Sequence, residues 1–200
     1  MKIIIALLFS LAAPLAFAQD IALPAPQTNG GKPLMQALAA RQSGRQYSDR
    51  DLAPQTLSNL LWAAYGFNRP EKRTAPSARN RQEMEVYVFL KDGVYLYDAK
   101  ANKLIQKAAG DHRATAGTQA FVATAPVNLV LVGDLSKNER ELIHADSGFI
   151  SQNVYLFCAS EGLATVVRAG VDKPALAKLL GLREQQEAFY NQCIGYPPAP

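Results

Sequence analysis

Residues 85–98, with the sequence EVYVFLKDGVYLYD, carry the pattern that decides the fold. Residues 85–90 and 94–98 are rich in β-branched and aromatic side chains, which favour β-strands. Asp92-Gly93 between them is typical of a tight hairpin turn, because glycine adopts positive φ at no steric cost. Since the strands of a hairpin are antiparallel, this stretch predicts a mostly antiparallel sheet.

The segments on either side of this hairpin alternate between helix and strand patterns. Residues 125–134 are almost continuously apolar, which predicts a buried central strand. Residues 67–81 look irregular and basic. Helices are predicted at residues 33–41, 54–66, 149–162 and 173–180. Two further strands are predicted at residues 164–168 and 187–194. These elements predict an α+β domain of three layers, in which helices flank a central, mostly antiparallel sheet.

The first residues are typical of an export signal. Lys2 is followed by the apolar run 3–9, and Ala16-Phe17-Ala18 precedes Gln19. We expect residues 1–18 to be a signal peptide cleaved after Ala18, which implies export to the periplasm. A retained membrane anchor is less favoured, because the apolar run is short and is not extended past Pro14. Residues 19–31 are predicted to be an extended segment and residues 32–200 a single domain.

Composition excludes several classes of protein. The 200 residues are 48% hydrophobic and 19% charged, as in a globular domain rather than a disordered chain. Two cysteines and two histidines are too few for a disulfide scaffold or a zinc finger, and no metal site is predicted. Cys158 and Cys193 are favoured as free, buried thiols, although an oxidising compartment leaves a disulfide between them as the alternative.

The positive charge is concentrated in one segment. The whole chain has a formal net charge of +4, whereas residues 41–81 hold eight cations and three carboxylates, a net charge of +5. Seven of those cations are arginine, whose planar guanidinium suits phosphate oxygens. Charge alone leaves three alternatives: a solvated loop, a nucleic-acid surface, and a site for a small phosphorylated ligand. Nucleic acid is the least favoured, because no pattern of aromatic side chains alternates with the arginines.

Three motifs, in order along the chain, resemble those of the nitroreductase family, which binds flavin mononucleotide (FMN). Residues 41–47 match R-x-S-x-R-x-[FY], and residues 76–82 match P-S-x-x-N-x-Q. Residues 161–165 resemble the helix-ending G-L-[GA] turn. The resemblance extends over about residues 34–197.

The resemblance implies which residues bind FMN. Residues 41–45 would hold its phosphate and the polar edge of its ring, and loop 76–82 would lie beside the ring, often from the partner subunit. Turn 162–164 would bring backbone close to one ring face. The implied cofactor-binding residues are Arg41, Ser43, Arg45, Pro76, Ser77, Asn80, Gln82, Gly162, Leu163 and Ala164. Arg41 and Arg45 would project together if the helix ending near Arg41 persisted through them.

In one respect the chain departs from the family pattern. Many relatives carry a basic residue after the G-x-P segment that contacts the phosphate, whereas this sequence ends at Pro200. The candidates to replace it are Arg168, Arg73, Arg79 and Arg81.

The resemblance implies an FMN-dependent oxidoreductase that passes electrons or hydride through the flavin to a small planar acceptor. The flavin would carry the chemistry, and relatives imply a homodimer with flavin at its interface. The alternative is a non-catalytic exported protein that retains the fold and serves as a flavin-binding or accessory module.

Overall fold

The computed structural model describes residues 19–199. The expected signal peptide, residues 1–18, lies outside the described residues. Within the described part of the chain, no helix is both long and apolar enough to cross a membrane.

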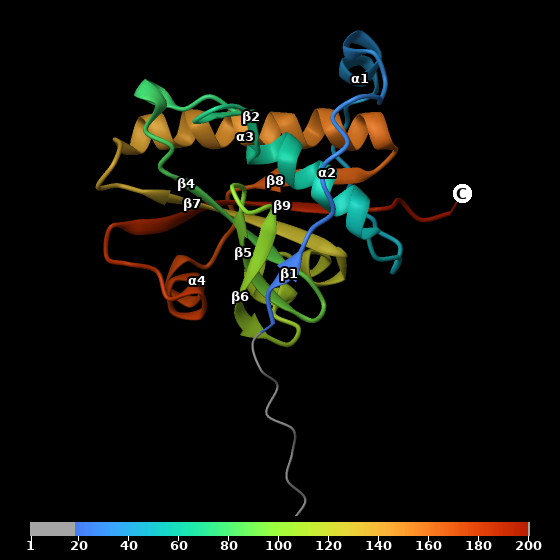
Figure 1. Ribbon diagram of the computed structural model, residues 1–200. Helices are drawn as coiled ribbons and strands as arrows, with labels where there is room; N and C mark the ends of the chain where they lie inside the picture. The colour runs from blue at the N-terminus through green and yellow to red at the C-terminus, as the bar shows by residue number, and fades with distance from the viewer. Residues whose placement is uncertain (1–18, 200) are drawn as a thin grey trace, which may run out of the picture.

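A seven-stranded sheet forms the middle of the molecule (Figure 1). Its strand order is β1-β6-β5-β4-β7-β9-β8, and every neighbouring pair is antiparallel. The strands are β1 (Ile21–Ala22), β4 (Met84–Phe89), β5 (Gly93–Asp98), β6 (Lys103–Ala109), β7 (Val127–Asp134), β8 (Ala164–Arg168) and β9 (Gln186–Gly195). The prediction of an α+β fold with a mostly antiparallel sheet is confirmed.

The hairpin and the central strand lie where the sequence predicts them. In the hairpin, Phe89 is paired with Val94 and Val88 with Tyr95. All eight residues of β7 are buried between β4 and β9. A strand buried on both faces needs helices above and below it, and both faces of this sheet are covered.

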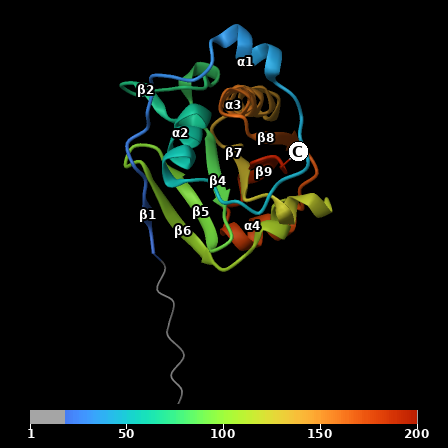
Figure 2. The same ribbon diagram turned by 90° about the vertical axis from the view of Figure 1, so that its right-hand side faces the viewer.

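The larger cover is formed by α2 (Pro54–Tyr65) and α3 (Arg140–Glu161), with the short α1 (Leu34–Ala40) above them (Figure 2). Leu60, Leu61, Ile143, Ile150 and Val154 fill the core on this side and are 0% exposed.

The opposite face is covered by α4 (Lys173–Leu180) and the 3₁₀ turns η2 (Arg113–Ala116) and η3 (Ala120–Thr124). Val122 and Leu176 are fully buried in a second hydrophobic core on that face. The expected three-layer arrangement is therefore present. Cys158 and Cys193 are both free and buried, as favoured from the sequence.

Three stretches differ from the sequence prediction. Helix α3 begins at Arg140 rather than at residue 149. Its first turns were missed in the sequence because Asp146 and Ser147, which are buried in the structure, are polar and interrupt the apolar pattern. Strand β6 has a weak pattern of lysine and glutamine and was not predicted. Residues 67–81 are less irregular than expected, since they contain the hairpin β2 (Phe67–Arg69) and β3 (Lys72–Arg73) and the turn η1 (Ala78–Asn80).

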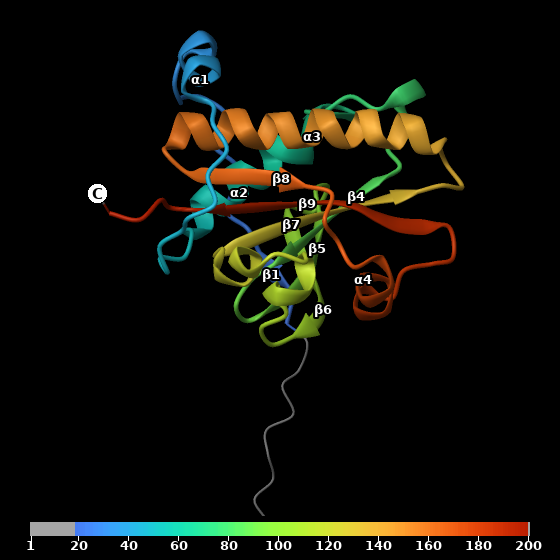
Figure 3. The same cartoon turned by 180° about the vertical axis from the view of Figure 1, so that it is seen from behind.

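Helix α1 lies at the outer edge of the molecule, above the end of α3 (Figures 1–3). It buries only Ala37, while Leu34 is 63% exposed, Met35 74% and Leu38 43%. On α3, Phe149 is also 46% exposed. These apolar side chains are only partly covered within the described chain.

Candidate functional site

A cleft of about 610 Å³ lies where α3 ends and the edge strand β8 begins. Three segments far apart in the sequence bound it: residues 40–46, the turn 162–165, and Pro197-Pro198. Lys32 and the end of α3 complete the wall. The first and third predicted motifs therefore meet at one place.

The first motif is held along the edge of β8 by its backbone. Gly44 N donates a hydrogen bond to Thr165 O at 2.9 Å, and Ser48 N donates to Tyr196 O at 2.9 Å. A Cβ on Gly44 would lie 3.0 Å from the Cβ of Ala164, so only glycine allows this close approach without a shift. Figure 3 shows the segment after α1 descending past the end of α3 and the edge strand β8.

The expected helical spacing of Arg41 and Arg45 is wrong. Helix α1 ends at Ala40, and Arg41 has extended backbone with φ −60° and ψ 121°. In extended chain, residues two apart lie on the same side, and Arg41 and Ser43 both reach Tyr155 of α3. The Arg41 guanidinium lies 5.3 Å from the centre of the Tyr155 ring, and Ser43 Oγ lies 2.9 Å from Tyr155 Oη.

The turn after α3 forms the floor of the cleft. Gly162 has φ +70° and ends the helix in the left-handed conformation that favours glycine. Leu163 N then donates to Cys158 O at 2.8 Å, and Ala164 begins β8. Small side chains here leave room for a flat group against the backbone.

The second motif does not reach this cleft within one subunit. Ala78 N donates to Asp146 Oδ2 at 2.9 Å, so loop 76–82 lies near the start of α3, whereas Cys158 on the cleft wall lies near its end. Twelve residues of helix separate these positions, which is about 18 Å at 1.5 Å per residue. Ser43, Arg45 and residues 162–164 are thus brought together at the cleft. Arg41 contacts Tyr155 and is not among the residues that line the cleft, and the four predicted residues of loop 76–82, Pro76, Ser77, Asn80 and Gln82, lie away from it.

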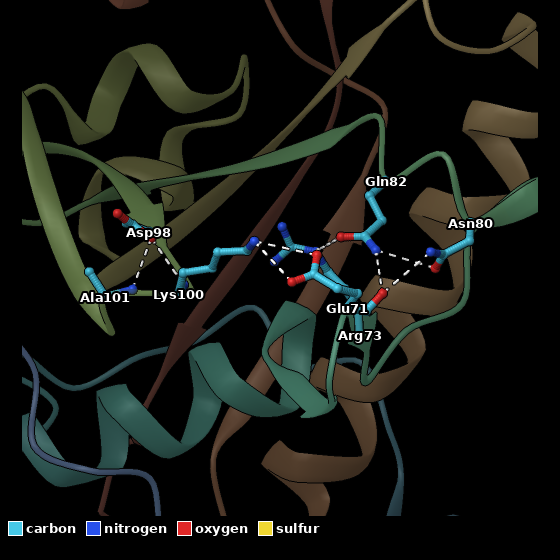
Figure 4. A network of polar contacts seen from close by, with 7 residues as sticks. All are labelled: Glu71, Arg73, Asn80, Gln82, Asp98, Lys100 and Ala101. Atoms are coloured by element: carbon cyan, nitrogen blue, oxygen red, sulfur yellow. Dashed lines mark hydrogen bonds and ion pairs between the residues drawn. The ribbon is translucent and has the colours of Figure 1, made fainter.

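Contacts with the β2–β3 turn hold the polar side chains of this loop (Figure 4). Gln82 Nε2 donates to Glu71 O at 2.9 Å, and Gln82 Oε1 accepts from Arg73 Nε at 3.0 Å. Asn80 Nδ2 donates to the same Glu71 carbonyl at 3.3 Å. Ser77 Oγ accepts from Gln82 N at 2.9 Å, which closes the loop on itself.

The loop also stores backbone strain. Of the five non-glycine residues with left-handed φ in the described chain, three lie in this loop, Arg79, Asn80 and Gln82, and a fourth, Glu71, lies in the β2–β3 turn that contacts it. Such residues cost of order 1–3 kcal/mol each and cluster at functional sites. The concentration of strain supports a functional role for the loop.

The basic residues suggested as replacements for a C-terminal phosphate contact lie elsewhere. The Arg168 guanidinium packs over the Phe121 ring at 4.8 Å. Arg73 Nη1 donates to Tyr65 O at 2.8 Å, and Arg81 Nη1 donates to Lys137 O. Arg79 is not among the residues that line the cleft.

Lys32 is the cleft cation that sequence reasoning missed. Its backbone N donates to Ser160 Oγ at 2.8 Å, and its Nζ donates to Ala159 O at 3.1 Å. Lys32 lies outside every motif, so only the packing of the segment before α1 onto the end of α3 reveals it.

The cleft has little acid–base chemistry of its own. None of the residues lining it is an aspartate, glutamate or histidine. Cys158 is in the wall, but burial raises the pKa of its thiol far above the usual range, so it stays protonated. No group of three or more potential metal ligands occurs among residues 19–199. What the lining does offer is cationic and hydroxyl donors beside apolar side chains, which suit an organic phosphate.

Comparison with known proteins agrees with this geometry. The model of the Nitroreductase family matches residues 38–196. A Methanocaldococcus jannaschii protein classed as a nitroreductase is 30% identical over 169 residues, which cover 76% of this chain and 85% of that protein.

Solved structures extend the comparison. A Ralstonia eutropha JMP134 protein classed as a nitroreductase superposes with a TM-score of 0.86 at 36% identity, covering 100% of this chain and 99% of that one. The FMN-dependent nitroreductase of Clostridium difficile R20291 shares the fold, with a TM-score of 0.61 at 18% identity over 83% of this chain and 88% of that one. The chain belongs to the nitroreductase family of oxidoreductases.

Proposed function

We propose that this protein is an FMN-dependent oxidoreductase that acts on a small planar acceptor. One observation carries the proposal: Ser43 and Arg45 line the same cleft as Gly162, Leu163 and Ala164. These two motifs are more than a hundred residues apart, and the resemblance assigns both to the flavin. The name of the C. difficile relative, which shares the fold, is consistent with FMN as the cofactor.

The residues present fit FMN chemically. A volume of about 610 Å³ falls in the usual range of roughly 300–1,000 Å³ for small-molecule sites. Arg45, Ser43 and Lys32 offer cationic and hydroxyl donors suited to a phosphate, while Leu163, Ala164 and the two prolines offer apolar surface suited to a ring.

When bound, FMN supplies the two-electron redox chemistry, which no side chain here provides. Arg45 and Lys32, the two cations that line the cleft, would balance the charge of its phosphate, and Ser43 would donate a hydrogen bond to it. Leu163 and Ala164 would exclude water from one side of the ring. Because the cleft lining includes cations and no carboxylates, its potential favours neutral or anionic acceptors over cationic ones.

We further propose that the protein is a homodimer, because loop 76–82 lies at the opposite end of α3 from the cleft. A partner subunit packed antiparallel along α3 would bring its own Ser77 and Asn80 to this cleft. The exposed apolar residues Leu34, Met35 and Phe149 would be covered by the same contact. Export to the periplasm, with cleavage after Ala18, stays part of the proposal and rests on residues 1–18 alone.

Substitution of Arg45 by alanine tests the proposed site. A hydrogen bond to a charged group contributes about 1.5–3 kcal/mol, so Arg45→Ala should weaken FMN binding about 10- to 100-fold. The measurement is an FMN titration followed by quenching of flavin fluorescence, with circular dichroism to show that the fold is kept. Arg69→Ala is the matched control, since Arg69 is exposed on β2 and outside the cleft.

Equal FMN affinity in Arg45→Ala and the unchanged protein would remove Arg45 from the site. The accessory-protein alternative has a different signature: FMN would bind with full affinity, yet no nicotinamide or other reductant would drive turnover of any nitro or quinone acceptor.

A further inference from the structure

Tyr155 contacts three groups, one of which, Ser43, lines the cleft. It lies on α3 and is 8% exposed. Its Oη is 2.9 Å from Ser43 Oγ and accepts a hydrogen bond from Val167 N at 3.1 Å. Its ring lies under the Arg41 guanidinium, 5.3 Å from ring centre to guanidinium carbon. None of the three sequence motifs includes this tyrosine.

The contact between Tyr155 Oη and Ser43 Oγ allows either hydroxyl to donate, and counting donors and acceptors favours the phenol as the donor. A phenol has one proton and can also accept. The amide of Val167 can only donate, so it occupies an acceptor position on Tyr155 Oη. The phenol proton then needs an acceptor, and among the described residues Ser43 Oγ is its partner. A buried hydroxyl proton left without an acceptor would cost about 1–3 kcal/mol.

This direction determines what Ser43 presents to the cleft. Because Ser43 Oγ accepts from Tyr155, its own proton is free to turn outward. The reverse direction would leave only serine lone pairs facing the cleft, and these would repel a phosphate oxygen.

Val167 N is available because β8 is the edge strand of the sheet. Two backbone groups on the free edge of β8 have partners outside the sheet: Val167 N donates to Tyr155 Oη, and Thr165 O accepts from Gly44 N.

We infer that Tyr155 is a positioning residue that turns the Ser43 hydroxyl proton toward the phosphate of the bound flavin nucleotide. This inference rests on the proposed function. It assigns Tyr155 the discrimination between FMN and riboflavin, which has the same ring system and no phosphate. The tyrosine hydroxyl acts on the ligand through Ser43, which lines the cleft.

The experiment compares dissociation constants of the full chain for FMN and for riboflavin. Tyr155→Phe keeps the ring under Arg41 and removes only the hydroxyl. We expect FMN affinity to fall about 3- to 10-fold, the value of one neutral hydrogen bond, and riboflavin affinity to stay within about twofold. Ser43→Ala should give a similar loss, and the double variant should lose no more than Ser43→Ala alone. Tyr97→Phe is the matched control, because Tyr97 is also 8% exposed but lies in the core on β5.

Each outcome decides the inference. Selective loss of FMN affinity together with non-additivity supports it. Equal losses for FMN and riboflavin would mean that the tyrosine only supports the fold, and unchanged FMN affinity would mean that its hydroxyl is irrelevant to the phosphate. Both results overturn the inference while leaving the proposed function intact. Failure of the unchanged protein to bind FMN at all would overturn the proposed function and this inference together.

Discussion

Glu83 lies between loop 76–82 and strand β4 and is only 1% exposed. Its two carboxylate oxygens have no hydrogen-bond partner among the described residues. Burial, reinforced by the neighbouring carboxyl of Asp146, raises the pKa of Glu83 to about 7. Asn138 faces the same carboxyl, and Tyr65 and Arg73 are the other polar neighbours of this pocket. Glu83 is thus a buried acid that holds its proton near neutrality.

The stability of the protein should therefore depend on pH through Glu83. Between its ordinary pKa of 4.5 and the folded value of about 7, the folded state keeps a proton that the unfolded state releases. The free energy of unfolding should fall as pH rises through this window, by about 3 kcal/mol. Glu83→Gln, which is neutral at every pH, should flatten the dependence. Denaturant unfolding at pH 5, 6, 7 and 8 measures this, and parallel curves for the two proteins would refute it.

Individual residues of the candidate site were predictable to different degrees. Ser43, Arg45 and residues 162–164 could be chosen because their motifs are local in sequence. Their relation to Tyr155 and Lys32 could not, because both approach the cleft only through tertiary packing onto α3. Arg41 shows a further limit: helical spacing suggested that it should face Arg45, yet the chain leaves the helix one residue earlier.

Among the elements, strong local patterns were predicted well. The Asp92-Gly93 turn and alternating apolar residues gave the β4–β5 hairpin, and continuous apolar sequence gave β7. The start of α3 was missed because Gly148 and buried polar residues interrupt its apolar face. Strand β6 was missed because its lysines and glutamine dilute the β pattern, and pairing with β5 stabilises it instead.

Helix α1 exposes three large apolar side chains, those of Leu34, Met35 and Leu38. Its apolar side chains should pack against the partner subunit, so Met35→Glu should shift the protein from dimer to monomer. Burying an unpaired charge in such a contact costs several kcal/mol, and FMN affinity should fall with dissociation. Sedimentation velocity over a range of concentrations measures the shift.

Gln36→Glu is the control for this variant, because it adds the same charge to the same helix without removing an apolar side chain. A Met35→Glu protein that sediments like the unchanged protein would show that α1 does not form the contact.

At the scale of the whole molecule, the basic segment 41–81 divides in two. Arg41 and Arg45 lie near the end of α3, whereas Arg73, Arg79 and Arg81 lie in or beside loop 76–82, near the start of α3. A formal net charge of +5 over 41 consecutive residues is therefore not one patch on one subunit. An antiparallel dimer would bring the two halves together around each flavin, which accounts for both locations.

Whether the cleft holds FMN is measured by the cofactor content of the purified protein. The protein should be yellow, with a flavin absorption spectrum, and denaturation should release about one FMN per chain. If cofactor is lost during purification, added FMN should restore that ratio. A colourless protein that takes up no added FMN would contradict the account.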